Sequence, residues 1–121
     1  MAGEDQKGAA SERGQLSTVE MKLIEGQVIE AARMCYDPEI PVNIYDMGLV
    51  YDVTVAADGG VLVVMTLTSP HCPAAQSLPI DVENRIKMIP GVTAVVVKVV
   101  WDPPWNPSMM TEAARLELGL M

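Results

Sequence analysis

The chain has 121 residues and a mass of 13.0 kDa, which leaves room for one domain. Its 16 acidic and 8 basic residues give a formal charge of −8, and without a cluster of Lys and Arg this acidity argues against a nucleic-acid partner. The sequence has no apolar run near the roughly 20 residues that span a bilayer and no signal-peptide pattern, so we expect a cytoplasmic protein with no membrane partner.

The N-terminal residues differ in composition from the rest of the chain. Residues 1–15 are rich in Gly, Ala, Ser and charged residues and have no apolar periodicity, so we expect a disordered tail. Residues 16–121 are expected to form a single domain, because no linker or internal repeat interrupts them. A domain of this size is only marginally stabilised by its own core, which favours an oligomer or a partner.

A first helix is predicted from its start signal. Ser17 and Glu20 have the spacing of a capping box, in which each side chain satisfies a free backbone N–H of the other residue. Apolar residues then recur at helical spacing and form one stripe. Pro38 disfavours helical geometry at Asp37, so the helix is expected to end by Tyr36.

Three later segments have the pattern of β-strands. Apolar and polar residues alternate over 49–55, and Asp58-Gly59-Gly60 supplies a tight hairpin turn. The returning segment, 61–68, is almost wholly apolar and is expected to be the central strand. Residues 92–101 have strong β propensity and form the third strand.

Two more helices complete the predicted fold. The second follows Pro73, and Pro79 is expected to kink or split it. Asn106 can cap a last helix that has Pro107 at its first position. The apolar edge of this last helix is expected to consist of Ala113, Leu116 and Leu120. The order α-β-β-α-β-α predicts a small two-layer α+β domain.

Cys72 is the strongest candidate for chemistry. It lies at or just before the start of the second helix, where unpaired N–H groups and the helix dipole favour a thiolate. A thiolate is a nucleophile and a ligand for soft metals. The alternative is that Cys72 is merely buried. Cys35 lies on the apolar stripe of the first helix, so core packing is its expected role.

His71 and Thr68 lie beside Cys72 in the sequence. His71 is the only histidine, and it could bind a metal or hold a proton for Cys72, although a solvent-exposed histidine without such a role is the favoured alternative. Thr68 could donate a hydroxyl hydrogen bond to a bound sulfur or anion, or only shape the turn.

Asp37 and Glu39 form a second polar group. They follow a helix end, where carboxylates gain nothing from the helix dipole, so structure alone does not readily explain them. Asp37 could still form a turn hydrogen bond within its own loop. Asn43 and Asp46 continue this polar edge, and Gly48 is expected to serve the backbone geometry.

A proline-rich segment between two tryptophans is predicted to lie at the surface. It consists of Trp101, Asp102, Pro103, Pro104 and Trp105. The segment either closes the edge of the core or serves as an anchor for a partner, because exposed tryptophan is costly and often contributes strongly to binding. With one histidine and no second cysteine near Cys72, no catalytic set emerges, and we do not expect an enzyme.

Several motifs between about residue 20 and residue 120 resemble those of one known family and occur in the same order. The sequence is similar to the SufT/PaaD-like metal–sulfur cluster assembly factors. The resemblance rests on DPEIPVNIYDMGLVY at 37–51, MTLTSPHCP at 65–73, IPGV at 89–92, VWDPPW at 100–105 and LELG at 116–119.

The resemblance implies the iron–sulfur assembly fold and a role, as in the SUF system, in delivering clusters to client apoproteins together with the assembly machinery. It implies that Cys72 is the reactive cysteine and that Asp37, Glu39 and Thr68 surround it. A cluster usually takes four protein ligands, and one chain offers a single motif cysteine. We therefore expect a transient iron–sulfur cluster or iron and no stably bound cofactor. A homodimer, a partner or a small thiol would complete the ligands, or the cluster is never held.

Three other functions fit the sequence less well. The main alternative is a metal-free adaptor between the assembly machinery and its clients. A thiol enzyme that uses Cys72 and His71 is a further alternative. A KH-like nucleic-acid module is set aside, because it needs a GxxG loop and a basic surface that the sequence lacks.

Overall fold

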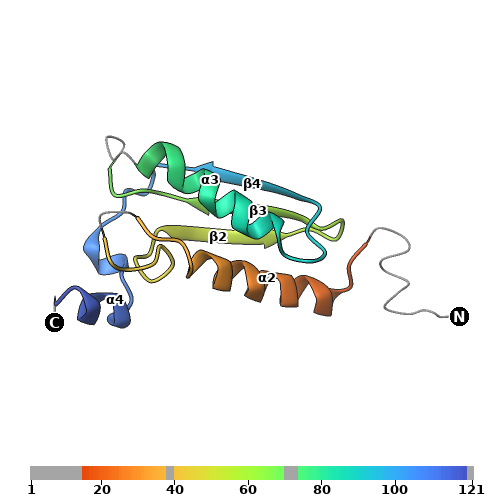
Figure 1. The fold of residues 1–121 in the computed structure, drawn as a ribbon, viewed down its shortest axis with the longest axis horizontal. Coiled ribbons are helices and arrows are strands. Elements are labelled where there is room, and N and C mark those ends of the chain that lie inside the picture. Colours follow the sequence, from red (N-terminus) through yellow and green to blue (C-terminus); the bar gives the residue numbers. More distant parts are fainter. Residues whose placement is uncertain (1–14, 38–39, 70–73, 120–121) are drawn as a thin grey trace, which may run out of the picture.

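The structure, a computed structural model, describes residues 15–37, 40–69 and 74–119. Apart from its last residue, the expected N-terminal tail lies outside this part of the chain. The elements follow the order α2 (Thr18–Ala32), β2 (Val50–Val55), β3 (Gly60–Met65), α3 (Ala74–Lys87), β4 (Ala94–Val99), the 3-10 helix η1 (Pro107–Met109) and α4 (Glu112–Glu117) (Figure 1). The α+β prediction is confirmed.

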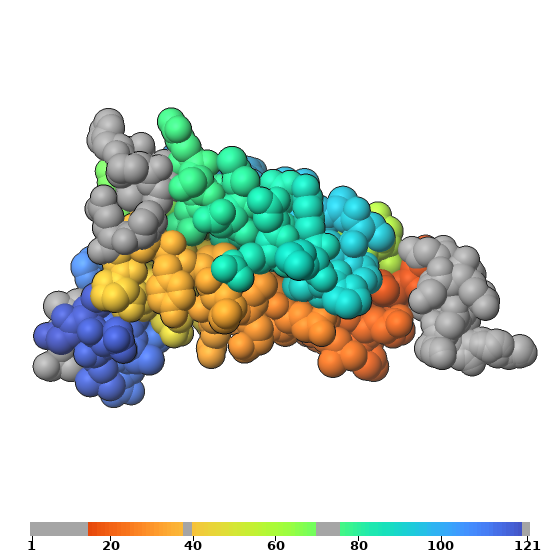
Figure 2. Space-filling view, in the orientation of Figure 1, coloured from red at the N-terminus to blue at the C-terminus, as the bar shows by residue number. Residues whose placement is uncertain are grey.

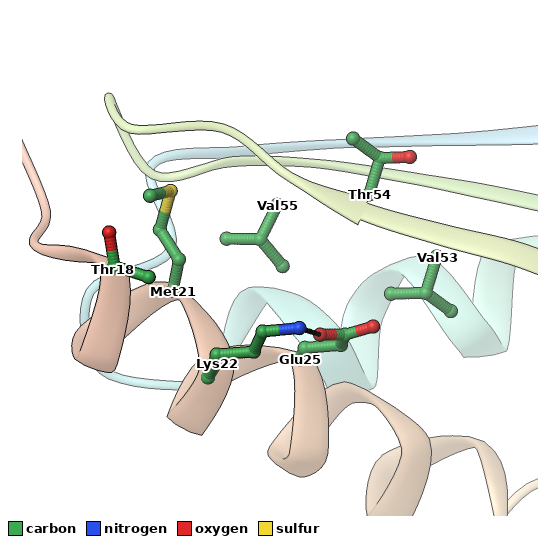
Figure 3. A pocket seen from close by; sticks show the side chains of 7 residues that line it. All are labelled: Thr18, Met21, Lys22, Glu25, Val53, Thr54 and Val55. Carbon is green, nitrogen blue, oxygen red and sulfur yellow. Dashed lines mark ion pairs between the residues drawn. The ribbon is translucent and has the colours of Figure 1, made fainter.

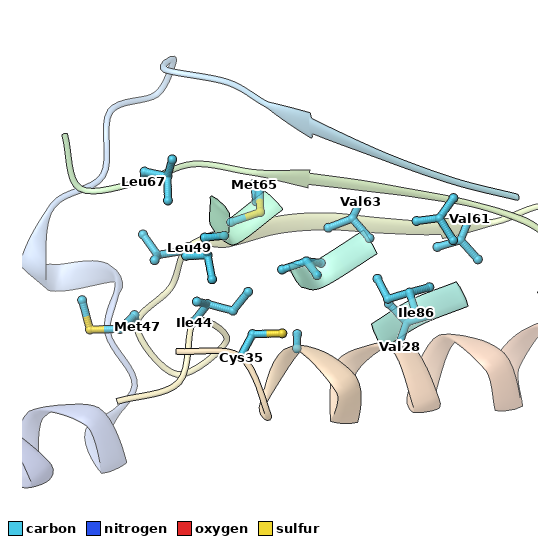
Figure 4. Close-up of a cluster of buried hydrophobic side chains, with 14 of the residues drawn as sticks. Val28, Cys35, Ile44, Met47, Leu49, Val61, Val63, Met65, Leu67 and Ile86 are labelled. Carbon is cyan, nitrogen blue, oxygen red and sulfur yellow. The ribbon is translucent and has the colours of Figure 1, made fainter. Parts of the chain in front are cut away.

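The strands form one mixed sheet in the order β2-β3-β4. β3 is the central strand, as predicted; it pairs antiparallel with β2 and parallel with β4. The parallel pair requires a crossover connection, which α3 supplies. Helices α2 and α3 cover the same face of the sheet (Figures 1 and 4). The other face is not covered by any described helix or strand.

The core lies between the helices and the sheet (Figure 4). Alternate residues of β3, namely Val61, Val63 and Met65, are buried, because successive side chains of a strand point to opposite faces. They pack with fully buried side chains from the helices and from the loop before β2. These include Val28, Leu78, Val82, Ile86, Ile44 and Leu49.

The start of α2 follows the predicted capping box. The backbone N–H of Ser17 donates to Glu20 Oε1 at 2.8 Å, and the backbone N–H of Glu20 donates to Ser17 Oγ at 3.1 Å. The helix ends at Ala32, within the predicted limit. Among the described residues, no helix is both long enough and apolar enough to cross a membrane.

Of the two alternatives predicted at Pro79, a kink or a split, the split is wrong, because α3 runs unbroken through this residue. Pro79 lies in the second turn, where it removes one intrahelical hydrogen bond and leaves the following turns intact.

The predicted last helix is two elements. Asn106 caps η1, with Pro107 at its start, as expected, but Met110 is extended and Thr111 then caps α4. The hydrogen bond from Thr111 N–H to the Asp46 carbonyl fixes the start of α4, and in this orientation Ala114 is buried and Leu116 is exposed, contrary to the predicted edge. Leu120 lies outside the described residues.

Candidate functional site

The predicted site falls partly outside the described residues. Cys72, His71 and Glu39 lie there, so their positions and roles stay predictions. Asp37, Thr68 and the segment 101–105 are described, and they show which parts of the fold surround the stretch that contains the motif cysteine.

A series of backbone hydrogen bonds joins the two predicted polar loops. The N–H of Thr66 donates to the carbonyl of Leu49 at 2.8 Å, Leu49 N–H donates to Ile44 at 3.0 Å, and Ile44 N–H donates to Cys35 at 2.9 Å. The bonds run from the segment after β3 to the segment after α2. Both segments therefore lie at the same end of the sheet, which Figure 1 also shows.

Asp37 and Thr68 differ in their surroundings at this end. The Asp37 residue is 3% exposed, and its backbone carbonyl accepts a hydrogen bond from Ile40 N–H at 3.0 Å. Thr68 is exposed, whereas Thr66, two residues earlier, is fully buried. Thr68 thus lies at the surface, while Asp37 is part of the packed base of the loop.

The loop between α2 and β2 is held in one shape by its own polar groups. Asn43 Nδ2 donates to Asp46 Oδ2 at 2.9 Å, and Asp46 N–H donates to Asn43 Oδ1 at 2.8 Å. Gly48 has φ +82°, and a Cβ there would collide with the carbonyl oxygen of Met109. Thr111 N–H donates to the carbonyl of Asp46 at 2.9 Å, so α4 is anchored to this loop (Figure 2). The predicted backbone role of Gly48 is confirmed.

The Trp101–Trp105 segment divides between the two roles considered for it. Trp105 is half-buried, and its indole N–H donates to the carbonyl of Met47 at 2.7 Å, so it closes the edge of the core. Trp101 is 43% exposed, and residues 102–104 are also exposed. The first four residues of the segment are therefore the more exposed part.

Tyr51 holds this segment in place, a role that the sequence did not suggest. Its hydroxyl donates to the carbonyl of Pro103 at 2.8 Å and lies 3.6 Å from Met109 Sδ. Burial raises the pKa of Tyr51, and a hydrogen bond with the Thr66 side chain opposes that rise. Tyr51 therefore connects the tryptophan segment to the buried residue at the root of the Thr68 loop. The strand register shifts between Val50 and Asp52, so strand alternation does not place Tyr51 or identify the distant residue that its hydroxyl reaches.

Cys35 is buried in the core, as predicted. Only 3% of the residue is exposed, and its thiol donates to the carbonyl of Ala31 at 3.4 Å. Burial raises the pKa of the Cys35 thiol; Arg85 opposes this rise and Asp81 adds to it. Cys35 is a neutral thiol near pH 7 and is a poor candidate for a metal ligand.

The hollows in the described surface offer little chemistry of their own. A shallow one of about 260 Å³ lies between α2 and the edge of β2 and contains the ion pair of Lys22 and Glu25, 3.7 Å apart (Figure 3). Another, of about 200 Å³, lies between the loop after α2 and α4, and Asp46 and Glu117 line it. Within residues 15–37, 40–69 and 74–119, no three His, Cys, Asp or Glu residues form a group that could hold a metal ion.

Comparisons with known proteins agree with the motifs. The model of the family described as iron–sulfur cluster assembly protein matches residues 25–99. A protein of Porphyromonas gingivalis (strain ATCC BAA-308 / W83), named Fe-S protein maturation auxiliary factor, is 48% identical over 97 residues, which are 80% of this chain and 92% of that protein. The Fe-S protein maturation auxiliary factor SufT of Staphylococcus aureus (strain USA300) is 39% identical over 87 residues, 72% of this chain and 99% of its own.

A solved structure supports the same fold. A crystal structure of a domain of unknown function from Bacillus anthracis superposes with a TM-score of 0.79 at 33% sequence identity. The match covers 87% of this chain and 100% of that one. The α+β architecture therefore recurs in a related domain over nearly its whole length.

Proposed function

Since the chain belongs to the iron–sulfur cluster assembly protein family, we propose that it is a maturation factor that carries a cluster or iron transiently and transfers it to client apoproteins through Cys72. The observation that carries this proposal is the surroundings of the described residues on either side of the motif cysteine. In the sequence, Cys72 falls between β3 and α3, and the described residues that follow β3 lie at the end of the sheet where the Asp37 loop and the tryptophan segment are both attached.

The number of available ligands supports transient carriage. A cluster usually requires four protein ligands, and Cys35 is buried with a raised pKa, which leaves Cys72 as the one cysteine suited to bind iron. A cluster held by one thiolate needs ligands from a client, from a small thiol or from a second copy of the chain in a homodimer. Exchange of those ligands would release the cargo. Glu39, His71 and Thr68 are proposed as polar neighbours of the thiolate, with Asp37 supporting their loop.

The exposed part of the tryptophan segment is the proposed docking surface for clients or for the assembly machinery. Trp101 presents an aromatic surface, while the hydrogen bonds of Tyr51 and Trp105 fix the backbone on which it stands. A surface that is already ordered loses little conformational entropy on binding. The proposed setting is the cytoplasm, where a thiol such as Cys72 stays reduced, and the proposed role is not enzymatic.

The test compares two cysteine variants in cells that depend on this chain for client maturation. Cys72→Ser is expected to abolish the activity of an iron–sulfur client enzyme, because serine is a poor ligand for iron. Cys35→Ala is the matched control, since it removes the other cysteine from the core and leaves the proposed ligand in place. Full client activity with Cys72→Ser at normal protein level would refute the role of Cys72.

One alternative, the metal-free adaptor, is favoured by the exposure of Trp101. Anaerobic reconstitution with iron and sulfide distinguishes the two functions. A visible absorption band that is present in the Cys35→Ala chain and lost in Cys72→Ser supports carriage. If no such band forms, while substitution of Trp101 still impairs client maturation, the chain acts as an adaptor.

A further inference from the structure

The face of the sheet opposite the helices exposes apolar side chains from two strands. Leu62 is 37% exposed and Val96 is 59% exposed, although both belong to strands whose other side chains form the core. No helix or strand in the described part of the chain packs on this face. The described residues therefore leave this face open.

The strand register arranges this face in rows. Thr54 pairs with Leu62, and Leu62 pairs with Val96, so these three side chains form one row across the sheet. Toward the hairpin, the next row contains only small residues. These are Ala56, Gly60 and Ala94, which line a hollow of about 380 Å³ beside the larger side chains.

The row on the other side carries opposite charges at its two ends. Asp52 pairs with Val64, and Val64 pairs with Lys98. Asp52 is on the edge strand β2 and Lys98 is on the edge strand β4, about 10 Å apart because two strand spacings separate them. Neither forms an ion pair within the described chain, although Thr54 Oγ1 donates to Asp52 Oδ2 at 3.1 Å. Each charge therefore still has room for a partner of the opposite sign.

We propose that this face binds a second copy of the chain through a two-fold axis that runs parallel to the strands above β3. Rotation about this axis places β2 of one copy over β4 of the other. Because Asp52, Val64 and Lys98 share one row, each Asp52 then lies opposite Lys98 of the second copy, and Leu62 packs against Leu62. Two ion pairs flank an apolar centre.

The positions of the two charges favour this axis over the other two-fold axis that would pack the same faces together. An axis perpendicular to the strands would place each strand over its own copy, so Asp52 would lie over β2 of the second copy and neither charge would gain a partner. Packed sheets of this kind are rotated by about 30° relative to each other, which displaces the edge residues of the charged row by roughly 4 Å. The long, flexible side chain of Lys98 can accommodate such a displacement.

The size of the face determines the strength of the dimer. Three strands of six residues cover about 20 Å by 14 Å, or about 280 Å² for each copy. A standard stable interface buries about 800 Å² on each partner. The dimer is therefore weak and reversible, and the net charge of −8 on each copy weakens it further at low ionic strength.

The proposed axis also fixes the relative direction of the two chains in the dimer. Both β3 strands run the same way along the axis, so residues 66–69 of the two copies leave the sheet at the same end of the dimer. The dimer does not depend on cluster carriage, and it is tested on the full chain without iron.

The experiment is sedimentation equilibrium of the full chain from micromolar to millimolar concentration at physiological ionic strength. Asp52→Lys and Lys98→Asp each place like charges opposite one another and are expected to weaken the dimer roughly tenfold. The double variant restores the opposite charges and is expected to return the dissociation constant to that of the parent chain. Leu62→Glu is expected to leave a monomer. Leu23→Glu, which changes an exposed leucine of α2, is the matched control and leaves the dimer unchanged.

Circular dichroism establishes that each variant is folded before its sedimentation is interpreted. A parent chain that stays monomeric up to millimolar concentration would overturn the proposal. A dimer that persists in Leu62→Glu would also overturn it, since the contact would then lie elsewhere. If the double variant stays as weak as the single ones, the proposed axis is wrong.

Discussion

Gly48 provides the sharpest test of how the loop before β2 is built. Its φ of +82° is in the left-handed region, which costs a residue with a Cβ about 1–2 kcal/mol. The Cβ of Gly48→Ala would also collide with the Met109 carbonyl. That carbonyl cannot retreat easily, because Tyr51 lies against the Met109 side chain and Thr111 is hydrogen-bonded to the loop.

Overpacking of this kind typically costs about 1–3 kcal/mol, so the two effects together predict a loss of about 2–5 kcal/mol. Alanine also lowers the conformational entropy of the unfolded chain, which offsets about 0.4–1 kcal/mol of this loss of stability. We therefore expect Gly48→Ala to lower the free energy of unfolding by about 2–4 kcal/mol, a large fraction of the stability of a small domain. Urea unfolding followed by far-ultraviolet circular dichroism measures this difference.

Two other glycines serve as matched controls for the same substitution. Gly26 is exposed in α2, with nothing within 4 Å of an added Cβ, so Gly26→Ala should stabilise the protein by about 0.5–1 kcal/mol. Gly119 has φ +71° but open space around it, so Gly119→Ala measures how much the left-handed backbone alone lowers the free energy of unfolding. If Gly48→Ala costs no more than Gly119→Ala, the close approach to Met109 does not constrain the loop, and the reasoning is refuted.

Three further predictions use the same unfolding assay or a thiol assay. Trp105→Phe should lower the free energy of unfolding by about 1–3 kcal/mol, because the Met47 carbonyl loses its indole donor. Trp101→Phe should change this free energy by less than about 0.5 kcal/mol, because Trp101 is exposed. Equal effects would contradict the different roles of the two tryptophans. Ser17→Ala should lower the free energy of unfolding by about 1 kcal/mol, because α2 loses its N-terminal cap. An unchanged urea midpoint would contradict the capping role of Ser17. In a Cys72→Ser chain, Cys35 should resist alkylation by iodoacetamide up to pH 9.0. Because the folded state favours the neutral thiol, the stability that Cys35 contributes is complete below pH 9.0 and is lost as the pH rises through the raised pKa. Rapid labelling of Cys35 at pH 8 would contradict its burial.

Features governed by local chemistry could be predicted from the sequence. The capping box of Ser17 and Glu20 involves residues three positions apart, and both of its hydrogen bonds form. The apolar content of 61–68 identified the central strand, because a strand with neighbours on both sides and a helix layer above it excludes water. The place of Cys35 in the core followed from its helical spacing.

Features governed by distant contacts could not be predicted in this way. Tyr51 reaches Pro103 across 52 positions, and Trp105 reaches Met47 across 58. Neither pairing leaves a periodic signal. The break after η1 has a similar origin, because the Thr111 amide bonds to the loop before β2 and a continuous helix would not provide it. The proposed role of Cys72 rests on the family motif, since one cysteine has no spacing to interpret.

The contacts beyond β4 bear on where this domain can be cut. The family match ends at residue 99, yet Met110 and Ala114 are buried in the core and Trp105 supplies a hydrogen bond to its edge. A chain that ends at residue 99 would lack the buried side chains of Met110 and Ala114 and would leave the Met47 carbonyl without its donor. The folding unit therefore extends beyond the matched region, and truncations or fusions of this protein should keep the chain at least to the end of α4.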